Sequence, residues 1–384
     1  MKALVFDKNK TDWETSRGFE LVDIPEPILD ESKNPVDANY VILKVKFAGI
    51  CGTDRGIWNR QAFRDAILNT INEQIQTGKN PYRIIGHEFC GEVVKIGSKV
   101  TNVQVGDFVA PESHVICGEC YQCKLGQKEV CTNEKILGIS HDGGFAEFTK
   151  IPSHILWKTD LTKIRPEISA MQEPFGNAVH AGSKVNLKDK TVAIFGLGPI
   201  GSFLVLVAKG LGAKTIIGVD VSQSALDKGK VLGIDYGVLS KVKGGGFEHD
   251  TEVTENIKKL TGGVGVDVSF EMAGFNNSVN NCLYATRRGG EIVLFGIKQG
   301  NFVIEDYNRL VVHGFTFHAV IGRQLWQTWD ITKKLFEDKT NGIQEKMFNI
   351  ILNQGQGTIL PIAEYSKEKF EKMMAEFPKL LIKF

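Results

Sequence analysis

The 384-residue chain has no long hydrophobic run, no excess of charge of either sign and no internal repeat. Its richest apolar stretch, 200–208, is followed by Lys209 and is shorter than the roughly 20 residues that a membrane-spanning helix needs. A net charge of +1 gives no electrostatic reason to expect nucleic acid or an anionic membrane as a partner. The first residues, MKALVFDKNKTDW, lack the apolar core and cleavage site of a signal peptide, so we expect a cytoplasmic protein with reduced cysteines.

Glycine and cysteine are the residues that stand out. The chain contains 41 glycines, about 11% of its residues against roughly 7% on average. Without a collagen period, these glycines indicate turns and close backbone approaches. Seven cysteines are present, and four of them fall within residues 117–131. Ordinary hydrophobic and charged fractions and this length predict a globular protein of about two domains.

The first 150 residues are typical of an all-β, barrel-like domain. Short β-branched or aromatic runs, separated by glycine-containing turns, predict strands at 41–48, 91–96, 107–110 and 145–149. One segment differs, because Phe63, Ile67, Ile71 and Ile75 recur every four residues within Gln61–Gln76. That spacing predicts an amphipathic helix inserted between two strands.

From about residue 170 the pattern changes to alternating strands and helices. Strands are expected at 191–195, 215–219, 266–270 and 291–295, with helices at 200–211 and 224–232. Strands that alternate with helices at this interval indicate a parallel sheet. The chain is therefore predicted to be an α/β protein.

A glycine-rich turn follows the first of these strands. Gly196, Gly198 and Gly201 form G-x-G-x-x-G, with Pro199 and Ile200 between the last two glycines. In this order the glycines allow a tight turn, a close approach to a pyrophosphate and close helix packing. Asp220 ends the next strand, 24 residues after Gly196, where a carboxylate accepts hydrogen bonds from ribose and repels a 2′-phosphate. The pattern predicts NAD rather than NADP, whereas a turn that merely contains glycines is the alternative.

Four cysteines share one loop, with the spacing Cys117-x2-Cys120-x2-Cys123-x7-Cys131. Four thiolates suit a closed, tetrahedral zinc site of structural type. The alternatives are an iron–sulfur cluster, whose usual run ends C-x3-C-P, and disulfides, which a reducing compartment disfavours.

A second metal site is suggested by Cys51 in Gly-Ile-Cys-Gly-Thr-Asp and by His87-Glu88 in Ile-Gly-His-Glu. Each motif alone is weak, since a lone cysteine or histidine is usually a core residue. A catalytic zinc keeps two or three protein ligands and one open position.

Taken together, Cys51-Gly-Thr-Asp, Gly86-His-Glu, the four-cysteine loop and the glycine turn resemble the zinc-dependent medium-chain dehydrogenase/reductase superfamily over essentially the whole chain. Two further segments, Glu173-Pro-Phe-Gly-Asn-Ala-Val-His180 and Gly322-Arg-Gln-Leu-Trp-Gln-Thr-Trp329, are similar to L-threonine 3-dehydrogenases. The resemblance implies a GroES-like β-barrel catalytic domain at 1–167 and 318–384. It implies a Rossmann domain with a doubly wound parallel sheet at 168–317, and a homotetramer.

The resemblance also implies roles for individual residues. Cys51 and His87 would hold the catalytic zinc, with Glu88 and Glu173 completing or exchanging in its coordination shell. Thr53 would hydrogen-bond the substrate oxygen, and His114 would lie near the substrate. Besides the glycine turn and Asp220, the segments matching those that line NAD contain Phe295, Gly296, Ile297, Val320 and Ile321. Arg323 would contact the cofactor phosphates or the substrate, with a solvated surface arginine as the alternative.

Three features depart from the family pattern. Gly56 stands where threonine dehydrogenases usually place a histidine of the proton relay, and Ala225 where they often have an arginine. The predicted helix at 61–76 lengthens the connection between Cys51 and His87.

The expected reaction is NAD-dependent oxidation of a secondary alcohol to a ketone, with L-threonine giving 2-amino-3-oxobutanoate. A polyol, sugar or other secondary-alcohol dehydrogenase of the same superfamily is the alternative, since Cys51-Gly-Thr-Asp-Arg also resembles sugar dehydrogenases. An alternative of another class is a non-catalytic NAD-binding protein with structural zinc only. In each enzymatic case the partner is a small hydroxyl-bearing substrate.

Overall fold

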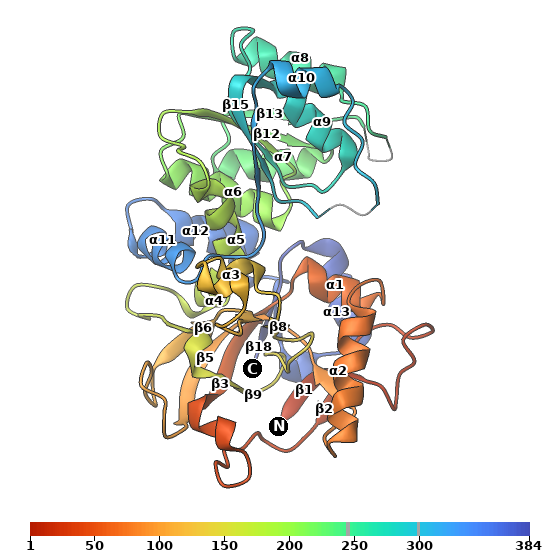
Figure 1. The fold of residues 1–384 in the computed structure, drawn as a ribbon, viewed down its shortest axis with the longest axis vertical. Helices are drawn as coiled ribbons and strands as arrows, with labels where there is room; N and C mark the ends of the chain where they lie inside the picture. Colours follow the sequence, from red (N-terminus) through yellow and green to blue (C-terminus); the bar gives the residue numbers. More distant parts are fainter. Residues whose placement is uncertain (243–245, 298–299) are drawn as a thin grey trace. The chain divides into compact units, whose positions relative to one another are not determined.

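The computed structural model describes residues 1–242, 246–297 and 300–384, which form two compact units (Figure 1). The first unit contains Met1–Pro174 and Met347–Phe384, and the second contains Phe175–Lys346. The expected boundaries of a catalytic domain at 1–167 and 318–384 and of a nucleotide-binding domain at 168–317 stay predictions. Within the described part of the chain, every helix is too short or too polar to span a bilayer.

Antiparallel sheets dominate the first unit. Its strands are β1 (Lys2–Asp7), β2 (Glu20–Asp23), β3 (Tyr40–Gly49), β4 (Tyr82–Ile84), β5 (Glu88–Ile96), β6 (Phe108–Pro111), β7 (His114–Val115), β8 (Lys135–Ile136), β9 (Phe148–Pro152), β10 (Leu156–Lys158), β17 (Ile359–Pro361) and β18 (Leu381–Lys383). The largest sheet has the order β10-β6-β5-β3-β18-β17, with β9 also paired to β3. The carboxyl-terminal strand β18 therefore lies directly beside β3, with Leu381 opposite Gly49.

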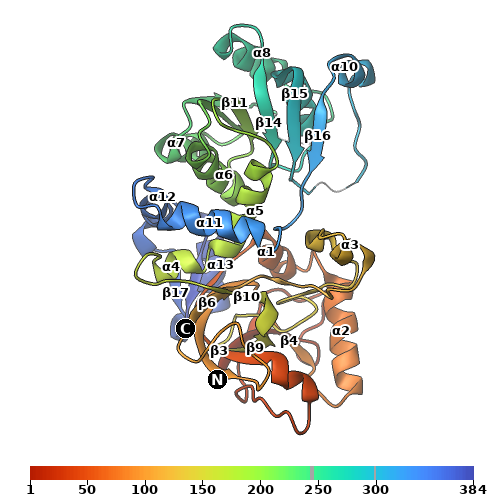
Figure 2. The same ribbon diagram turned by 60° about the vertical axis from the view of Figure 1, so that its left-hand side comes forward.

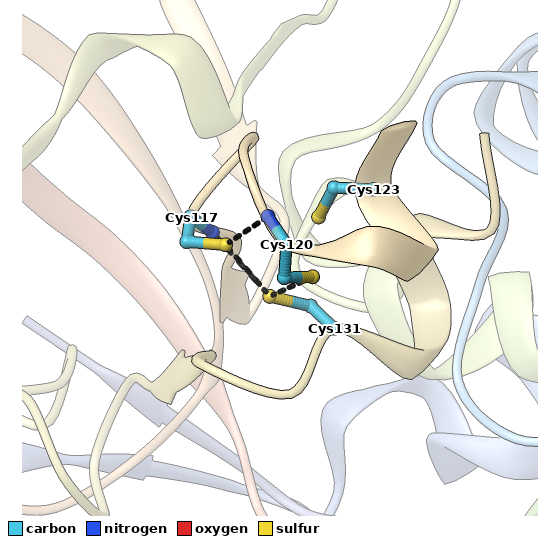
Figure 3. A group of neighbouring side chains, drawn as sticks. All are labelled: Cys117, Cys120, Cys123 and Cys131. Atoms are coloured by element: carbon cyan, nitrogen blue, oxygen red, sulfur yellow. Dashed lines mark hydrogen bonds between the residues drawn. The ribbon is translucent and has the colours of Figure 1, made fainter. Parts of the chain in front are cut away.

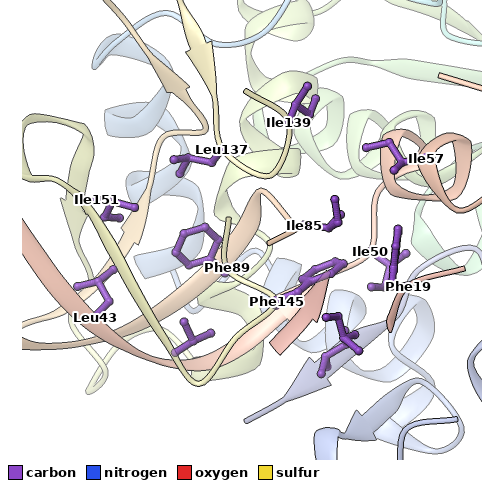
Figure 4. Packing of buried hydrophobic residues seen from close by; sticks show 14 of the residues in the cluster. Phe19, Leu43, Ile50, Ile57, Ile85, Phe89, Leu137, Ile139, Phe145 and Ile151 are labelled. Atoms are coloured by element: carbon purple, nitrogen blue, oxygen red, sulfur yellow. The ribbon is translucent and has the colours of Figure 1, made fainter. Parts of the chain in front are cut away.

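The helices of the first unit are α1 (Gly52–Trp58), α2 (Arg64–Gln76), α3 (Tyr121–Lys124), α4 (Pro166–Ser169) and α13 (Lys367–Glu376). Helix α5 (Gln172–Ser183) begins at the end of this unit's first segment. A continuous apolar core fills the space beneath the sheets (Figure 4). Phe19, Ile85, Phe89 and Phe145 are among its fully buried residues, since burial of large apolar side chains drives such packing.

The predicted inserted helix is present as α2, which lies beside β4 (Figure 2). Ile67 and Ile71 are buried, whereas Phe63 and Ile75 are 42% and 41% exposed, so only half of the predicted apolar stripe reaches the core. The polar residues Thr70, Glu73, Gln74 and Thr77 recur at helical spacing and line a cavity of about 720 Å³ within this unit.

One predicted strand is displaced. The sequence indicates a strand at 145–149, but β9 begins at Phe148. Phe145 bonds through its backbone to Leu4 and Ile85 instead, which places its ring in the core.

A six-stranded, all-parallel sheet forms the second unit. Its strands are β11 (Thr191–Phe195), β12 (Thr215–Asp220), β13 (Tyr236–Leu239), β14 (Val266–Glu271), β15 (Thr286–Leu294) and β16 (Thr316–Ala319), in the order β13-β12-β11-β14-β15-β16. The helices are α6 (Pro199–Gly210), α7 (Gln223–Leu232), α8 (Thr251–Leu260), α9 (Asn276–Ala285), α10 (Tyr307–Val312), α11 (Gln327–Glu337) and α12 (Ile343–Lys346). This order is that of a doubly wound sheet, and it reverses between β11 and β14. The predicted α/β fold with a parallel sheet is therefore confirmed.

Candidate functional site

The four cysteines of the 117–131 loop meet around one point (Figure 3). Their ligand atoms all lie within 4.8 Å of one another. The Sγ atom of Cys131 lies 3.5 Å from that of Cys117 and 3.9 Å from that of Cys120. Four ligands placed tetrahedrally at 2.3 Å from an ion are about 3.8 Å apart, so these separations fit zinc.

Backbone amides support the same loop. The amide of Cys120 donates to Cys117 Sγ at 3.3 Å, and the amide of Cys117 donates to Cys131 Sγ at 3.4 Å. Amides of Cys123 and Thr132 lower the pKa of Cys120 to about 6, which favours the thiolate that binds metal. All seven cysteines lie in the described residues and none forms a disulfide. The cluster is therefore a closed site suited to structural zinc.

A second group of metal-ligating side chains joins Cys51, His87 and Glu88, whose ligand atoms also lie within 4.8 Å of one another. Cys51 lies between β3 and the first residue of α1, and His87 directly precedes Glu88 at the start of β5. Gly86 has φ +93°, and a Cβ atom there would overlap the ring of Phe145. Only glycine fits this turn, which aims His87 at Cys51.

His87 has a buried carboxylate behind it. Asp54 Oδ2 accepts the Cys51 amide at 2.8 Å, and its Oδ1 lies 3.6 Å from His87 Nδ1, beyond hydrogen-bond range. Among the described residues neither of these buried atoms, Asp54 Oδ1 and His87 Nδ1, has a hydrogen-bond partner. Burial raises the pKa of Asp54 to about 6. Burial lowers the pKa of His87, but the Asp54 carboxylate and the Cys51 sulfur outweigh it and raise the pKa well above its usual value. This donor set and its carboxylate–histidine pair fit a zinc ion.

The two glutamates are held by different partners. Glu88 is 1% exposed, and its Oε2 forms an ion pair with Lys379 Nζ, which is also buried. Glu173 is 4% exposed and lies outside the group of three, and its Oε1 accepts a hydrogen bond from Ser113 Oγ at 2.7 Å. The structure therefore brings Glu88, and not Glu173, to within 4.8 Å of the other two ligand groups.

Thr53 and His114 lie in the same unit. Thr53 is the second residue of α1 and is half-buried. His114 begins β7, and both its amide and its Nδ1 lie 3.1 Å from Oε1 of the fully buried Glu112.

The glycine turn of the second unit connects β11 to α6, as predicted. A Cβ atom at Gly201 would lie 1.9 Å from the carbonyl oxygen of Gly196, so only glycine allows this packing. A Cβ atom at Gly198 would meet open space, where a phosphate approaches in dinucleotide-binding turns. Pro199, which has no N–H group, and Ile200 start the helix, and the first N–H groups of a helix lack intrahelical partners and can bind an anion.

Asp220 lies at the end of β12, and both of its carboxylate oxygens accept backbone amides. Oδ2 accepts the amide of Leu197, inside the glycine turn, at 2.7 Å, and Oδ1 accepts the amide of Ser222 at 2.9 Å. A carboxylate offers about four acceptor sites, so two remain for ribose hydroxyls.

The other predicted cofactor residues follow β15 and β16. Phe295, Gly296 and Ile297 come directly after β15, and Val320 and Ile321 after β16. Since the carboxyl ends of parallel strands meet at one edge, these residues share an edge of the sheet with the glycine turn and Asp220. Ile297 is 85% exposed.

Arg323 is 2% exposed, so the alternative of a solvated surface arginine is wrong. Its Nη1 donates to Asn177 Oδ1 at 3.0 Å, and its side chain packs where a Cβ atom of Gly176 would lie. His180 Nδ1 lies 3.0 Å from the Gly322 carbonyl oxygen. The two segments that resemble threonine dehydrogenases are therefore bound to each other.

The structure adds four residues that sequence reasoning did not assign. They are Asp54 behind His87, Lys379 on Glu88, Ser113 on Glu173 and Glu112 on His114. Asp54, Ser113 and Glu112 lie close in sequence to predicted site residues, and this proximity is a signal that could have found them. No such signal exists for Lys379, because it lies almost 300 residues from Glu88 along the chain.

Comparison with known proteins agrees with this architecture. Residues 37–161 match the family model described as an alcohol dehydrogenase GroES-like domain, and residues 199–338 match that of a zinc-binding dehydrogenase. An L-threonine 3-dehydrogenase of Pyrococcus horikoshii is 36% identical over 322 residues, which cover 83% of this chain and 84% of the relative.

Among solved structures, an alcohol dehydrogenase from Thermus sp. ATN1 has a TM-score of 0.80 at 21% identity, over 100% of this chain and 99% of that chain. An Escherichia coli CFT073 alcohol dehydrogenase crystallised with NADH has a TM-score of 0.76 at 22% identity, with the same coverage. At this identity the two structures establish the fold alone.

The two matched domain models, the relative at 36% identity and the two thiol-containing clusters converge on one assignment. The chain belongs to the zinc-binding medium-chain dehydrogenase family, and it is a dehydrogenase with L-threonine 3-dehydrogenases among its curated relatives.

Proposed function

We propose that this protein is an NAD-dependent L-threonine 3-dehydrogenase that converts L-threonine and NAD⁺ to 2-amino-3-oxobutanoate, NADH and a proton. The observation that carries the proposal is the Cys51, His87 and Glu88 cluster in a chain that matches threonine dehydrogenases over most of its length.

Cys51 and His87 are the proposed ligands of a catalytic zinc, with Glu88 or Glu173 as a further ligand. When bound, zinc supplies a Lewis acid that lowers the pKa of the substrate hydroxyl, and NAD⁺ accepts the hydride. Asp54 would orient His87 through Nδ1, leaving Nε2 for the metal.

Thr53 would hydrogen-bond the substrate oxygen, accepting its proton at Oγ1 while passing its own hydroxyl proton on. His114 would contact the substrate, with its ring oriented by Glu112. In the second unit, Asp220 would bind the adenosine ribose and the amides of the glycine turn the pyrophosphate. Phe295, Gly296, Ile297, Val320, Ile321 and Arg323 remain the proposed cofactor-contacting residues, and a cytoplasmic homotetramer remains the proposed state.

The second candidate is a polyol, sugar or other secondary-alcohol dehydrogenase. The observation that favours it is Gly56, which leaves the relay position of threonine dehydrogenases without a histidine. Initial rates with L-threonine, sorbitol, glucose and 2,3-butanediol, each with NAD⁺ and NADP⁺, separate the two candidates. L-threonine with NAD⁺ should give the highest kcat/KM, and a higher value for any other alcohol would refute the threonine assignment.

Metal content tests the catalytic centre itself. We expect two zinc ions per wild-type chain and one in Cys51→Ser, which should also lose NAD⁺ reduction. Cys90→Ser is the matched control, since Cys90 is fully buried and belongs to neither metal cluster. A single zinc in the wild-type chain, without turnover of any alcohol, would instead support a non-catalytic NAD-binding protein.

A further inference from the structure

Arg55, the residue after Asp54, is bound to the carboxyl-terminal part of the chain. Its Nη1 donates to the Met374 carbonyl oxygen at 2.5 Å, and its Nη2 donates to those of Phe377 and Pro378 at 2.7 and 3.2 Å. Met374 lies near the end of α13, and the other two residues follow that helix. Carbonyls at a helix end lack intrahelical partners and favour a cation, so one guanidinium fixes this segment to α1.

The next residue along this segment is Lys379. It is 2% exposed, and its Nζ donates to Glu88 Oε2 and, at 3.3 Å, to the Ile50 carbonyl oxygen. The Ile50 amide in turn donates to the Leu380 carbonyl oxygen at 3.0 Å. Lys379 is therefore positioned from one side by the strand pairing of β18 with β3 and from the other by Arg55.

Glu88 is the group on which this arrangement acts. Its carboxylate belongs to the candidate metal cluster, yet one of its oxygens is bound to the Lys379 ammonium. Gly49 makes room for that oxygen, since a Cβ atom at Gly49 would overlap it. A buried carboxylate that lies between an ammonium group and a divalent cation is attracted to both. The position of the ammonium group therefore determines whether the carboxylate oxygen coordinates the metal ion.

We propose that Arg55 is a positioning residue of the metal centre. By fixing Phe377 and Pro378, it places Lys379 on Glu88 and keeps this carboxylate from becoming a full ligand of the metal. The inference rests on the proposed catalytic metal centre at Cys51 and His87. The three acceptors of the Arg55 guanidinium are carbonyl oxygens of this chain.

The test uses the full chain with Co²⁺ in both metal sites, because cobalt absorption reports the number and kind of ligands. The spectrum of Cys51→Ser, which retains only the four-cysteine site, is subtracted. In Arg55→Gln and in Lys379→Met, Glu88 should join the metal, and the visible absorption of the Cys51 site should fall at least twofold as its coordination number rises. Introducing Glu88→Gln into either variant should largely reverse the fall.

The matched control is Arg60→Gln. Arg60 also donates to two backbone carbonyls, those of Ile57 and Gly18, but does not contact the Phe377–Lys379 segment. Its cobalt spectrum should equal that of the wild type. If Arg55→Gln does not fold, Arg55→Lys replaces it and should shift the spectrum in the same direction, because lysine lacks the guanidinium fork.

An unchanged spectrum in the Arg55 variant would overturn the inference, as would a change of the same size in Arg60→Gln. An unchanged spectrum in Lys379→Met would overturn it as well. If Cys51→Ser binds as much cobalt as the wild type, the proposed metal centre fails, and with it the basis of this inference. The other negative results leave that centre intact.

Discussion

Replacement of Asp220 by asparagine should weaken NAD(H) binding through the glycine turn as well as through the ribose. In the structure both carboxylate oxygens of Asp220 accept backbone amides, one from Leu197 and one from Ser222. Asparagine has a single acceptor oxygen, so its NH₂ group must face one of these two N–H groups. One amide then loses its acceptor, and the ribose loses one of the oxygens that would bind it.

The expected size of the effect follows from that loss. Leu197 is 4% exposed, so an amide there without an acceptor costs about 1–3 kcal/mol. If the cost falls on the cofactor-binding conformation, the dissociation constant of NADH rises about 5- to 150-fold. Binding of NADPH should change less or improve, because the carboxylate no longer repels the 2′-phosphate.

Fluorescence titration with NADH and NADPH measures both constants. Asp227→Asn is the control, since it removes the same charge from α7, where Asp227 accepts an exposed hydrogen bond from Gln223 and forms an exposed ion pair with Lys230. An NADH dissociation constant for Asp220→Asn within twofold of the wild-type value would refute the reasoning, as would an equal loss in Asp227→Asn.

Three further predictions concern stability. Burial raises the pKa of Glu271 in the folded state. Ionisation of this carboxyl therefore lowers the stability of the fold at pH values above the folded-state pKa, and has no effect below the pKa of the unfolded chain. Differential scanning calorimetry should show that Glu271→Gln raises the melting temperature at pH 7.5 but not at pH 4. Cys120→Ser should remove one of two zinc ions and lower the melting temperature, and unchanged metal content would contradict a structural zinc site. Arg83→Met should lower the free energy of unfolding, measured in urea, by about 2 kcal/mol. This loss is smaller than that for a fully buried ion pair, because the partner Asp142 is 38% exposed. A decrease of less than about 0.5 kcal/mol would contradict the prediction.

Local sequence patterns predicted the parallel sheet and its glycine turn because the determinants are close together in the chain. Gly196, Gly201 and Asp220 lie within 25 residues and fix the β11-α6-β12 unit. The pairing of β18 with β3 could not be predicted in this way. Leu381 and Gly49 are more than 330 residues apart, and a three-residue strand shows too little alternation to be recognised.

The same limit applies to the candidate site. Cys51, His87 and the four-cysteine loop could be predicted because metal ligands have few substitutes and regular spacing. Lys379 could not, because a lysine near the end of a chain is ordinarily solvated, and only the pairing of β18 buries it beside Glu88. For the same reason the sequence leaves a solvated surface position open for Arg323. Its burial and its hydrogen bond to Asn177 exclude that position.

Gly56 and the inserted helix α2 were two separate departures in the sequence, but the structure connects them. A Cβ atom at Gly56 would lie 2.9 Å from the Cβ atom of Ala62, in the segment that leads into α2. A histidine at position 56 therefore requires Ala62 to move, so the segment that leads into α2 disfavours a larger residue there. Gly56→His alone should lower the melting temperature, and Ala62→Gly should restore it.

This pair of substitutions also tests the proton path. If position 56 is the missing relay position, Gly56→His with Ala62→Gly should add a group that titrates near the ordinary histidine pKa of about 6.5 to the pH dependence of kcat. Ala62→Gly alone is the control and should leave that profile unchanged. A double variant that is stably folded but has the wild-type profile would show that protons leave the site by another route, for which His114, oriented by Glu112, is a candidate.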